Sequence, residues 1–198
     1  MEPAESRCVG AGLPRPYVWS VIVMSFLAEY PQLKIIQKIA VKRRARVYLV
    51  GGFLRDVLLS RRQTDFDFAV EKNAVAFAKQ FADSVKGAFV LLDDEHGCGR
   101  VVKKIDGIPW TFDFADFRAK TLKKDIASRD FTINTLYADL LKIKDGEEVH
   151  SHIVDLSGAR KDLKKKIYKM IPCSYGDYQT AIDNEIPERW EKAFSRYN

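Results

Sequence analysis

The segment Asp65-Phe66-Asp67-Phe68-Ala69-Val70 decides the interpretation of this sequence. Successive side chains of a β-strand point to opposite faces, so a strand here turns its phenylalanines and Val70 to one face and Asp65 and Asp67 to the other. A half-exposed strand with polar outward positions is the simplest explanation. However, aspartate is a poor strand former, and two aspartates in one short strand indicate a specific role.

A second acidic strand is predicted at Trp110-Thr111-Phe112-Asp113-Phe114, where the aromatic side chains share one face and Asp113 points away. If the two strands pair, Asp65, Asp67 and Asp113 converge, and clustered carboxylates repel one another unless a cation lies among them. Mg²⁺ prefers oxygen ligands of this kind. We predict that Asp65 and Asp67 bind two magnesium ions, of which one activates an attacking 3′-hydroxyl and the other holds a triphosphate and the leaving pyrophosphate. Asp116 competes with Asp113 for the third position.

A glycine pair precedes the first acidic strand. The residues from Arg46 to Val50 predict a strand that runs into Gly51-Gly52, and a helix is predicted from Phe53 to Leu59. Two glycines between a strand and a helix let backbone N–H groups approach phosphate oxygens closely. Arg55, one helical turn further, adds a charge-assisted contact. Since most glycine pairs are ordinary turns, this feature is weak evidence by itself.

The third motif is Ser128-Arg129-Asp130-Phe131-Thr132-Ile133-Asn134, within a helix that we predict from Asp125 to about Thr135. On a helix, Asp130 and Asn134 are four residues apart and share a face. In one interpretation these two residues and Arg129 bind ribose hydroxyls and phosphate. In the other, they form a capping network around Asp130. The residues alone leave both interpretations open.

The order of the three motifs is Gly51-Gly52-x-x-Arg55-Asp56, then Asp65-x-Asp67, then the segment 129–134. Together they resemble the head domain of class II tRNA nucleotidyltransferases and bacterial poly(A) polymerases. Further agreement comes from residues 92–102 and 153–163. The resemblance extends over about residues 46–170.

The resemblance implies an α/β (α+β) nucleotidyltransferase fold, with a mixed β-sheet flanked by helices, and Mg²⁺ as the cofactor. The implied reaction adds CMP and AMP, from CTP and ATP, to the 3′ end of tRNA without a nucleic-acid template. Asp65 and Asp67 match the metal-binding pair of the family, and Asp113 matches its less uniform third carboxylate. The implied nucleotide-binding residues are Gly51, Gly52, Arg55, Arg129, Asp130 and Asn134.

The sequence also departs from the family pattern. Ser128 stands where the family usually has a second arginine, and Ser60 replaces a usual glycine. After Met170 we find no Glu-Asp-x-x-Arg helix, which selects CTP or ATP in the family. We therefore expect a head-only fragment, a truncated reading frame, or half of a split enzyme whose second chain supplies the neck and body domains. Poly(A) addition and a non-catalytic nucleotide- or RNA-binding module are the alternatives.

Composition agrees with an anionic partner such as RNA. The chain has 198 residues, a net charge of +6, a pI near 9.1 and 46% apolar residues, which suffice for a core. Its three cysteines are far apart and predict neither a disulfide framework nor a zinc site, which favours a reducing, cytoplasmic location. The apolar run from Tyr17 to Ala28 is shorter than the roughly 20 residues that span a bilayer, so no membrane partner is predicted.

We predict three parts along the chain: a disordered tail over residues 1–16, the head domain over 17–170, and an atypical or truncated segment over 171–198. The stretch from Lys120 to Lys124 is predicted to be a mobile connection, and residues 158–166 a short basic helix. The basic side chains between Arg160 and Lys169 either contact RNA phosphates or form a solvated helix face.

Overall fold

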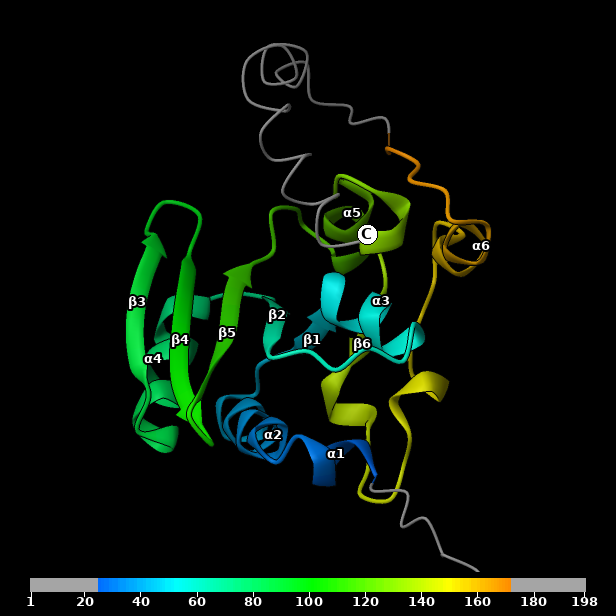
Figure 1. The fold of residues 1–198 in the computed structure, drawn as a ribbon. Helices are drawn as coiled ribbons and strands as arrows, with labels where there is room; N and C mark the ends of the chain where they lie inside the picture. The colour runs from blue at the N-terminus through cyan, green and yellow to red at the C-terminus, as the bar shows by residue number, and fades with distance from the viewer. Residues whose placement is uncertain (1–24, 172–198) are drawn as a thin grey trace, which may run out of the picture.

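A computed structural model describes residues 25–171 of the chain. These residues form a mixed sheet of six strands with helices against it (Figure 1). The predicted α/β (α+β) class is therefore confirmed. The predicted tail over residues 1–16 and the segment beyond residue 171 lie outside the described residues.

The strand order across the sheet is β3-β4-β5-β2-β1-β6. One neighbouring pair, β2 and β5, is parallel, and the other four pairs are antiparallel. The strands are β1 (Val47–Val50), β2 (Asp65–Val70), β3 (Ala88–Asp93), β4 (Cys98–Ile105), β5 (Ile108–Asp116) and β6 (Tyr137–Asp139). The strand predicted from the alternation of aspartate and phenylalanine coincides with β2.

Six α-helices and three short 3-10 helices complete the described part of the chain. The α-helices are α1 (Phe26–Glu29), α2 (Gln32–Arg43), α3 (Gly52–Leu58), α4 (Ala74–Val85), α5 (Leu122–Ala127) and α6 (Ala159–Lys165). The 3-10 helices are η1 (Thr132–Asn134), η2 (Leu140–Lys142) and η3 (Val149–Ser151). Among residues 25–171 no helix has the length and hydropathy to cross a membrane.

Aromatic side chains dominate one face of the sheet. Phe66 on β2 stacks on Phe112 of β5 with ring centroids 4.9 Å apart, and Phe68 stacks on Phe114 at the same distance. Helices α1, α2 and α4 cover this face with fully or nearly fully buried residues. The rings meet because β2 and β5 are parallel and their register places the phenylalanines of the two strands opposite one another. The same alternation turns the aspartates of both strands to the opposite face.

A smaller apolar cluster lies on that opposite face, where Val50 of β1 and Ala69 of β2 pack against Ile126 of α5. Helix α5 therefore covers only part of the face that carries the aspartates. Two predictions made from the sequence differ from the structure in this region. Lys120 to Lys124 is not a mobile connection, because α5 begins at Leu122 with the Thr121 hydroxyl as its N-cap.

The helix predicted from Asp125 to Thr135 is also wrong, because α5 ends at Ala127 and η1 follows only at Thr132. The Ser128 hydroxyl donates to the Asp125 carbonyl oxygen (2.8 Å), and the Phe131 N–H donates to the Asp130 carboxylate (2.7 Å). Side chains that bond to the nearby backbone in this way compete with a continuous helix.

Candidate active site

Asp65 and Asp67 lie on the open face of the sheet, while the phenylalanines between and beside them are buried. In the parallel register of β2 and β5, Asp65 is opposite Thr111 and Asp67 is opposite Asp113. The Thr111 hydroxyl donates a hydrogen bond to the Asp65 carboxylate. The pairing of the two acidic strands, predicted from the sequence, thus places all three aspartates on one face.

Asp113 is held by an arginine of the next strand. The Arg100 guanidinium donates from Nε and Nη2 to the two carboxylate oxygens of Asp113, each at 2.7 Å. Asp116, the competing acid, accepts a hydrogen bond from the Ala74 N–H (2.7 Å) and so caps α4. Within residues 25–171 no group of three His, Cys, Asp or Glu side chains is arranged to hold a metal ion. The oxygen donors open to a cation are therefore those of Asp65 and Asp67.

The Asp67 carboxyl has an unusual environment. Its pKa is raised to about 6, first by desolvation and then by the neighbouring carboxylates of Asp113 and Asp65, while the guanidinium groups of Arg129 and Arg100 act in the opposite direction. The side chain is nonetheless open to solvent, and water moderates the effect of desolvation. A divalent cation relieves such crowding of negative charge, so this pair of oxygen donors fits Mg²⁺.

The glycine pair forms a turn that only glycine adopts easily at its first position. Gly51 has φ 74° and ψ −140°, a region that strains other residues. A Cβ at Gly51 would lie 3.3 Å from Nη1 of Arg129 and 3.5 Å from Oδ2 of Asp67. The turn therefore lets an arginine and the acidic strand approach the backbone closely. The Gly51 N–H donates to the Leu136 carbonyl oxygen (3.0 Å) and is not available to a phosphate. The backbone N–H groups at the start of α3, from Gly52 onward, are the ones that a phosphate could contact.

Arg129 lies at the junction between α5 and η1. Its Nη2 is 3.8 Å from the carboxylate of Asp125, which is only 5% exposed and also accepts the Arg118 N–H at 2.8 Å. Its Nε is buried and has no hydrogen-bond partner among the described residues. A buried donor of this kind is costly unless an acceptor is supplied, so it is suited to an anionic ligand.

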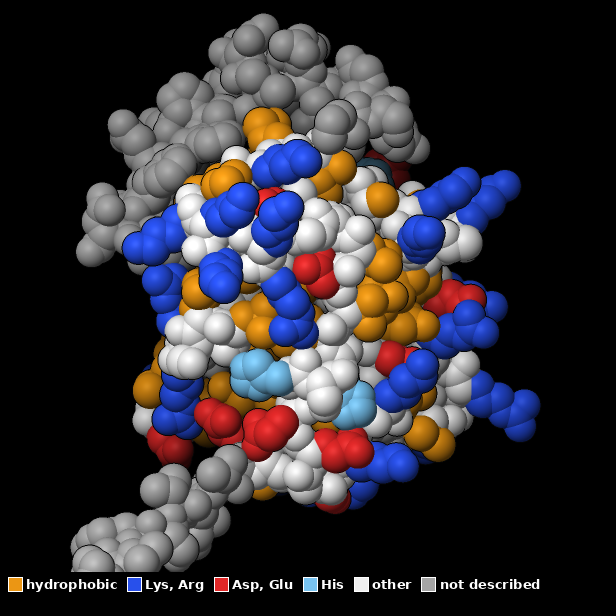
Figure 2. Space-filling view, turned by 90° about the vertical axis from the view of Figure 1, so that its right-hand side faces the viewer, with side chains coloured by type: hydrophobic (Ala, Val, Ile, Leu, Met, Phe, Trp, Pro, Cys, Tyr) orange, Lys and Arg blue, Asp and Glu red, His pale blue; other side chains and the backbone are white. Residues whose placement is uncertain are grey.

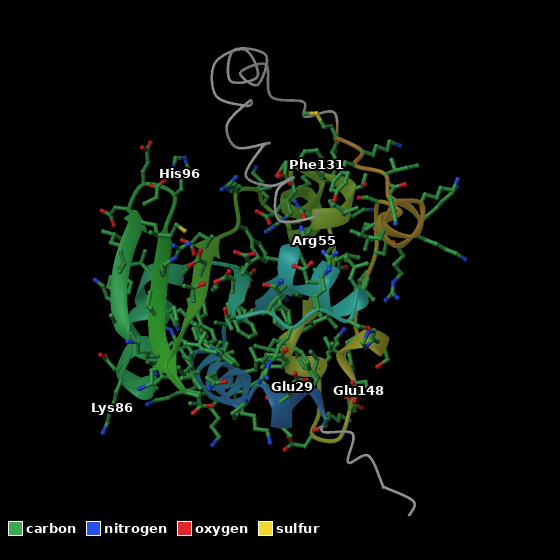
Figure 3. All side chains as sticks on the ribbon, viewed as in Figure 1. Glu29, Arg55, Lys86, His96, Phe131 and Glu148 are labelled. Atoms are coloured by element: carbon green, nitrogen blue, oxygen red, sulfur yellow. The ribbon has the colours of Figure 1, made fainter. Side chains whose placement is uncertain are left out.

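Arg55 connects α3 to the third motif. Its Nη1 donates to the Asn134 amide oxygen (2.9 Å), while Nε and Nη2 donate to the buried carboxylate of Asp56 at 3.1 and 2.8 Å. The Asn134 amide in turn donates to the Asp130 carboxylate (3.0 Å). The local network around Asp130, one of the two interpretations of this motif, is thus present, and it joins Arg55. Figure 3 shows Arg55 and Phe131 at the α5 side of the molecule.

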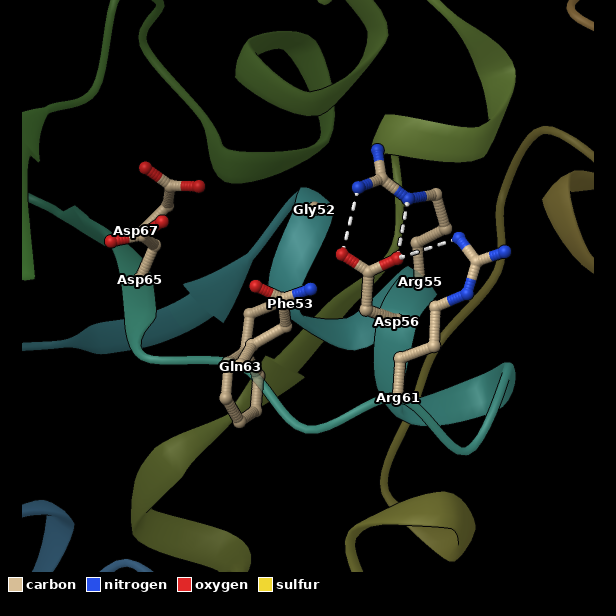
Figure 4. A pocket seen from close by; sticks show the side chains of 8 residues that line it. All are labelled: Gly52, Phe53, Arg55, Asp56, Arg61, Gln63, Asp65 and Asp67. Atoms are coloured by element: carbon tan, nitrogen blue, oxygen red, sulfur yellow. Dashed lines mark hydrogen bonds and ion pairs between the residues drawn. The ribbon is translucent and has the colours of Figure 1, made fainter. Parts of the chain in front are cut away.

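Some of these groups border a pocket of about 240 Å³ (Figure 4). Asp65 and Asp67 lie on one side of it and Arg55 and Arg61 on the other, with Gly52 between them. The complete lining is Gly52, Phe53, Arg55, Asp56, Arg61, Gln63, Asp65 and Asp67. One side of the pocket thus carries the exposed carboxylates of β2, and the other carries guanidinium groups paired with Asp56. Such a pocket can hold a polyanion together with its counter-cation.

Four residues that line the pocket were not predicted as site residues, and neither was Arg100; the four are Phe53, Asp56, Arg61 and Gln63. A signal for Arg100 was present in the hairpin. A two-residue turn at Asp106-Gly107 pairs position 100 with position 113, and the structure has this register. No comparable signal marks Arg61 or Gln63, because they belong to an irregular connection between α3 and β2.

Comparisons with known proteins show the family of the chain. The family model described as the poly A polymerase head domain matches residues 47–169. The CC-adding tRNA nucleotidyltransferase of Geobacter sulfurreducens is 31% identical over 156 residues, which are 79% of this chain and 33% of that protein. The A-adding tRNA nucleotidyltransferase of Aquifex aeolicus is 33% identical over 145 residues, which are 66% of this chain and 16% of that protein. This chain therefore spans a third or less of the length of these relatives.

Solved structures show the same similarity. The CCA-adding enzyme of Thermotoga maritima complexed with tRNA has a TM-score of 0.58 and 29% identity, over 71% of this chain and 32% of that one. A tRNA nucleotidyltransferase complexed with a primer tRNA and an incoming ATP analogue has a TM-score of 0.57 and 31% identity, over 69% of this chain and 38% of that one.

Proposed function

Because this chain belongs to the poly A polymerase head domain family, we propose that it is the head of a tRNA nucleotidyltransferase. In this role it adds CMP or AMP, from CTP or ATP, to the 3′ end of a tRNA without a template. The observation that carries the proposal is the shared pocket, in which Asp65 and Asp67 face Arg55 beside the diglycine turn.

We assign Asp65 and Asp67 to magnesium. When bound there, Mg²⁺ neutralises the negative charge that develops during nucleotidyl transfer and lowers the pKa of the attacking hydroxyl. The aspartates supply the oxygen ligands, and the carboxylate of Asp113 beside Asp67 adds negative charge that a cation would offset. Asp113 keeps its proposed role as the third carboxylate, with Arg100 bound to both of its oxygens.

The arginines and the third motif are assigned to the nucleotide. Arg129 has a buried Nε without a partner among the described residues, and a phosphate oxygen supplies the missing acceptor. Arg55 and the backbone at Gly52 border the same pocket, where they can hold further phosphate oxygens. Asp130 and Asn134 are assigned to the ribose hydroxyls, because an exposed carboxylate and a half-buried amide are joined here to Arg55 by hydrogen bonds.

The reaction is tested with the full 198-residue chain. The protein is incubated with Mg²⁺, labelled CTP or ATP, and a tRNA that lacks its 3′-terminal CCA, and the products are sequenced. We expect one to three added nucleotides. Long ATP-only tails on generic RNA would favour the poly(A) alternative. No incorporation, even with added neck and body domains from a relative, would contradict the proposal.

The chain spans about a third of the length of the Geobacter sulfurreducens CC-adding relative. We propose that a second chain or a following segment supplies the neck and body functions. Incorporation that appears only when those domains are added would support this view. A cytoplasmic location belongs to the same proposal, and the free thiol of Cys98 is compatible with a reducing compartment.

A further inference from the structure

Helix α6 and the residues after it carry a strong local positive charge. Between Ala159 and Ile171 the sequence has six basic residues and one acid, Asp162. Lysine and arginine side chains gather over this part of the molecule on the face shown in Figure 2. Residues 34–46 also carry six basic residues, without an acid, so the α6 charge is distinguished by its position beside the third motif and not by its size.

The helix turns its acid inward and its lysines outward. Asp162 accepts a hydrogen bond from the Thr132 hydroxyl of η1 at 2.7 Å, and Ala159 is fully buried. The lysines are exposed, and we call them the lysine surface: Lys161, Lys164, Lys165, Lys166 and Lys169. Within residues 25–171 none of these lysines lies within 4.0 Å of a carboxylate. No carboxylate of the described residues therefore neutralises their charge.

The lysine surface is joined to the candidate active site by hydrogen bonds. The Thr132 N–H donates to the Lys169 carbonyl oxygen, and the Ile171 N–H donates to the Asp130 carbonyl oxygen, both at 2.9 Å. Asp130 and Thr132 belong to the third motif of the site. The exposed ring of Tyr168 also contacts Phe131 of that motif, with centroids 6.5 Å apart. The lysine surface thus lies next to the residues of the third motif that we assign to the ribose.

We propose that the lysine surface binds the phosphate backbone of the RNA whose 3′ end enters the site. This inference rests on the proposed function and adds the surface by which the head holds its second substrate. Several lysines in sequence next to an exposed aromatic ring suit a nucleic-acid strand. Binding through phosphates is independent of sequence and sensitive to salt.

The test is the affinity of the full chain for a labelled tRNA lacking CCA, measured by fluorescence anisotropy without nucleotide at several salt concentrations. The variant combines Lys161→Ala, Lys164→Ala and Lys165→Ala. The control combines Lys38→Ala, Lys42→Ala and Lys104→Ala, which are exposed lysines on α2 and β4. Both variants lose three positive charges, so only the position of the charge differs.

We expect the α6 variant to bind tRNA about tenfold more weakly at ~0.1 M salt, with the slope of log K against log salt reduced by about 2. The control variant is expected to stay within about twofold of the unmodified chain. The inference is overturned if the α6 variant binds tRNA like the unmodified chain, if the control loses as much affinity, or if the unmodified chain does not bind tRNA.

A second arm separates this inference from the proposed function. The Kd for ATP with Mg²⁺ should be the same in both variants, and transfer at saturating tRNA should persist in the α6 variant with a raised KM for tRNA. If the α6 variant transfers nucleotides normally and also binds tRNA as tightly as the unmodified chain, only the inference about the lysine surface is overturned, and the proposed function stands. Vesicles containing anionic lipid serve as the competing partner. If the α6 variant loses only vesicle binding, the surface is a membrane site and the inference is wrong.

Discussion

Asp67 has two carboxylates and two guanidinium groups around it, and this balance of charge governs the site at the scale of single residues. Arg100 is bound to Asp113 through both oxygens, whereas Arg129 lies near Asp67 and the Gly51 backbone. Without a cation the pKa of Asp67 is raised, by desolvation first and then by the carboxylates of Asp113 and Asp65. The stability of the metal-free protein should therefore depend on the charge of this one side chain.

We predict that Asp67→Asn stabilises the metal-free protein at pH 7.5 but not at pH 4. The folded-state pKa of about 6 lies above the ordinary value of 3.8 for an aspartate, so the folded state binds the proton more tightly than the unfolded state. The contribution of Asp67 to stability is present below pH 4 and is lost as the pH rises to about 6. Urea unfolding in EDTA at both pH values measures this difference. An equal effect of the substitution at both pH values would refute it.

We also predict that Asp113→Asn lowers nucleotide transfer less than Asp67→Asn does. Both oxygens of Asp113 are occupied by Arg100, so its loss should cost no more than about tenfold, or about 1.4 kcal/mol of transition-state stabilisation. Asp67→Asn should cost about 10²–10³-fold or more. Single-turnover rates of the two variants give the comparison. Equal losses would show that Asp113 acts directly in the reaction.

At the scale of elements, the site depends on the turn between β1 and α3. The positive φ of Gly51 directs the chain into α3, and the missing side chain leaves room for Arg129 and Asp67. The third motif depends on a second irregular element, the break between α5 and η1. The sequence predicted one helix there because the spacing of Asp130 and Asn134 fits a helical face. The hydrogen bonds that end α5 are local and compete with helix propensity, which a sequence pattern does not resolve.

Gly51→Ala should lower both the stability and the affinity for ATP. The backbone strain costs about 1–3 kcal/mol, and the new methyl group displaces Arg129. Gly107→Ala is the matched control, since Gly107 also has a positive φ (82°) but has nothing within 4 Å of an added Cβ. Denaturation and calorimetric titration of ATP compare the two variants. If Gly107→Ala weakens ATP binding as much as Gly51→Ala, the turn has no specific role.

At the scale of the whole molecule, the family resemblance implied the α/β class, which the structure has. Local alternation of aspartate and phenylalanine predicted the acidic strands that coincide with β2 and part of β5, and the structure pairs them. The pocket lining was not predictable in full, since Arg61 and Gln63 reach it through tertiary contacts. The anchoring of α6 to the third motif through Asp162 also joins residues distant in sequence, and no local pattern marks it.

Ligand binding should stabilise the described fold as a unit. With ATP at about 100 times its Kd and Mg²⁺ present, we expect the Tm to rise by about 5–10 °C. Removal of Mg²⁺ by EDTA should abolish most of this rise, because the triphosphate and the two aspartates then repel one another. Differential scanning fluorimetry with and without EDTA measures the effect. An undiminished rise in EDTA would mean that nucleotide binding needs no metal.

The central claim is that Asp65 and Asp67 hold a divalent cation next to the nucleotide. Crystals grown with Mn²⁺ and a non-hydrolysable ATP analogue test it directly through the anomalous signal of manganese. We predict a peak within coordination distance of both carboxylates and of the triphosphate oxygens, between β2 and the diglycine turn. A bound nucleotide with manganese elsewhere, or with no peak beside these two aspartates, would contradict the claim.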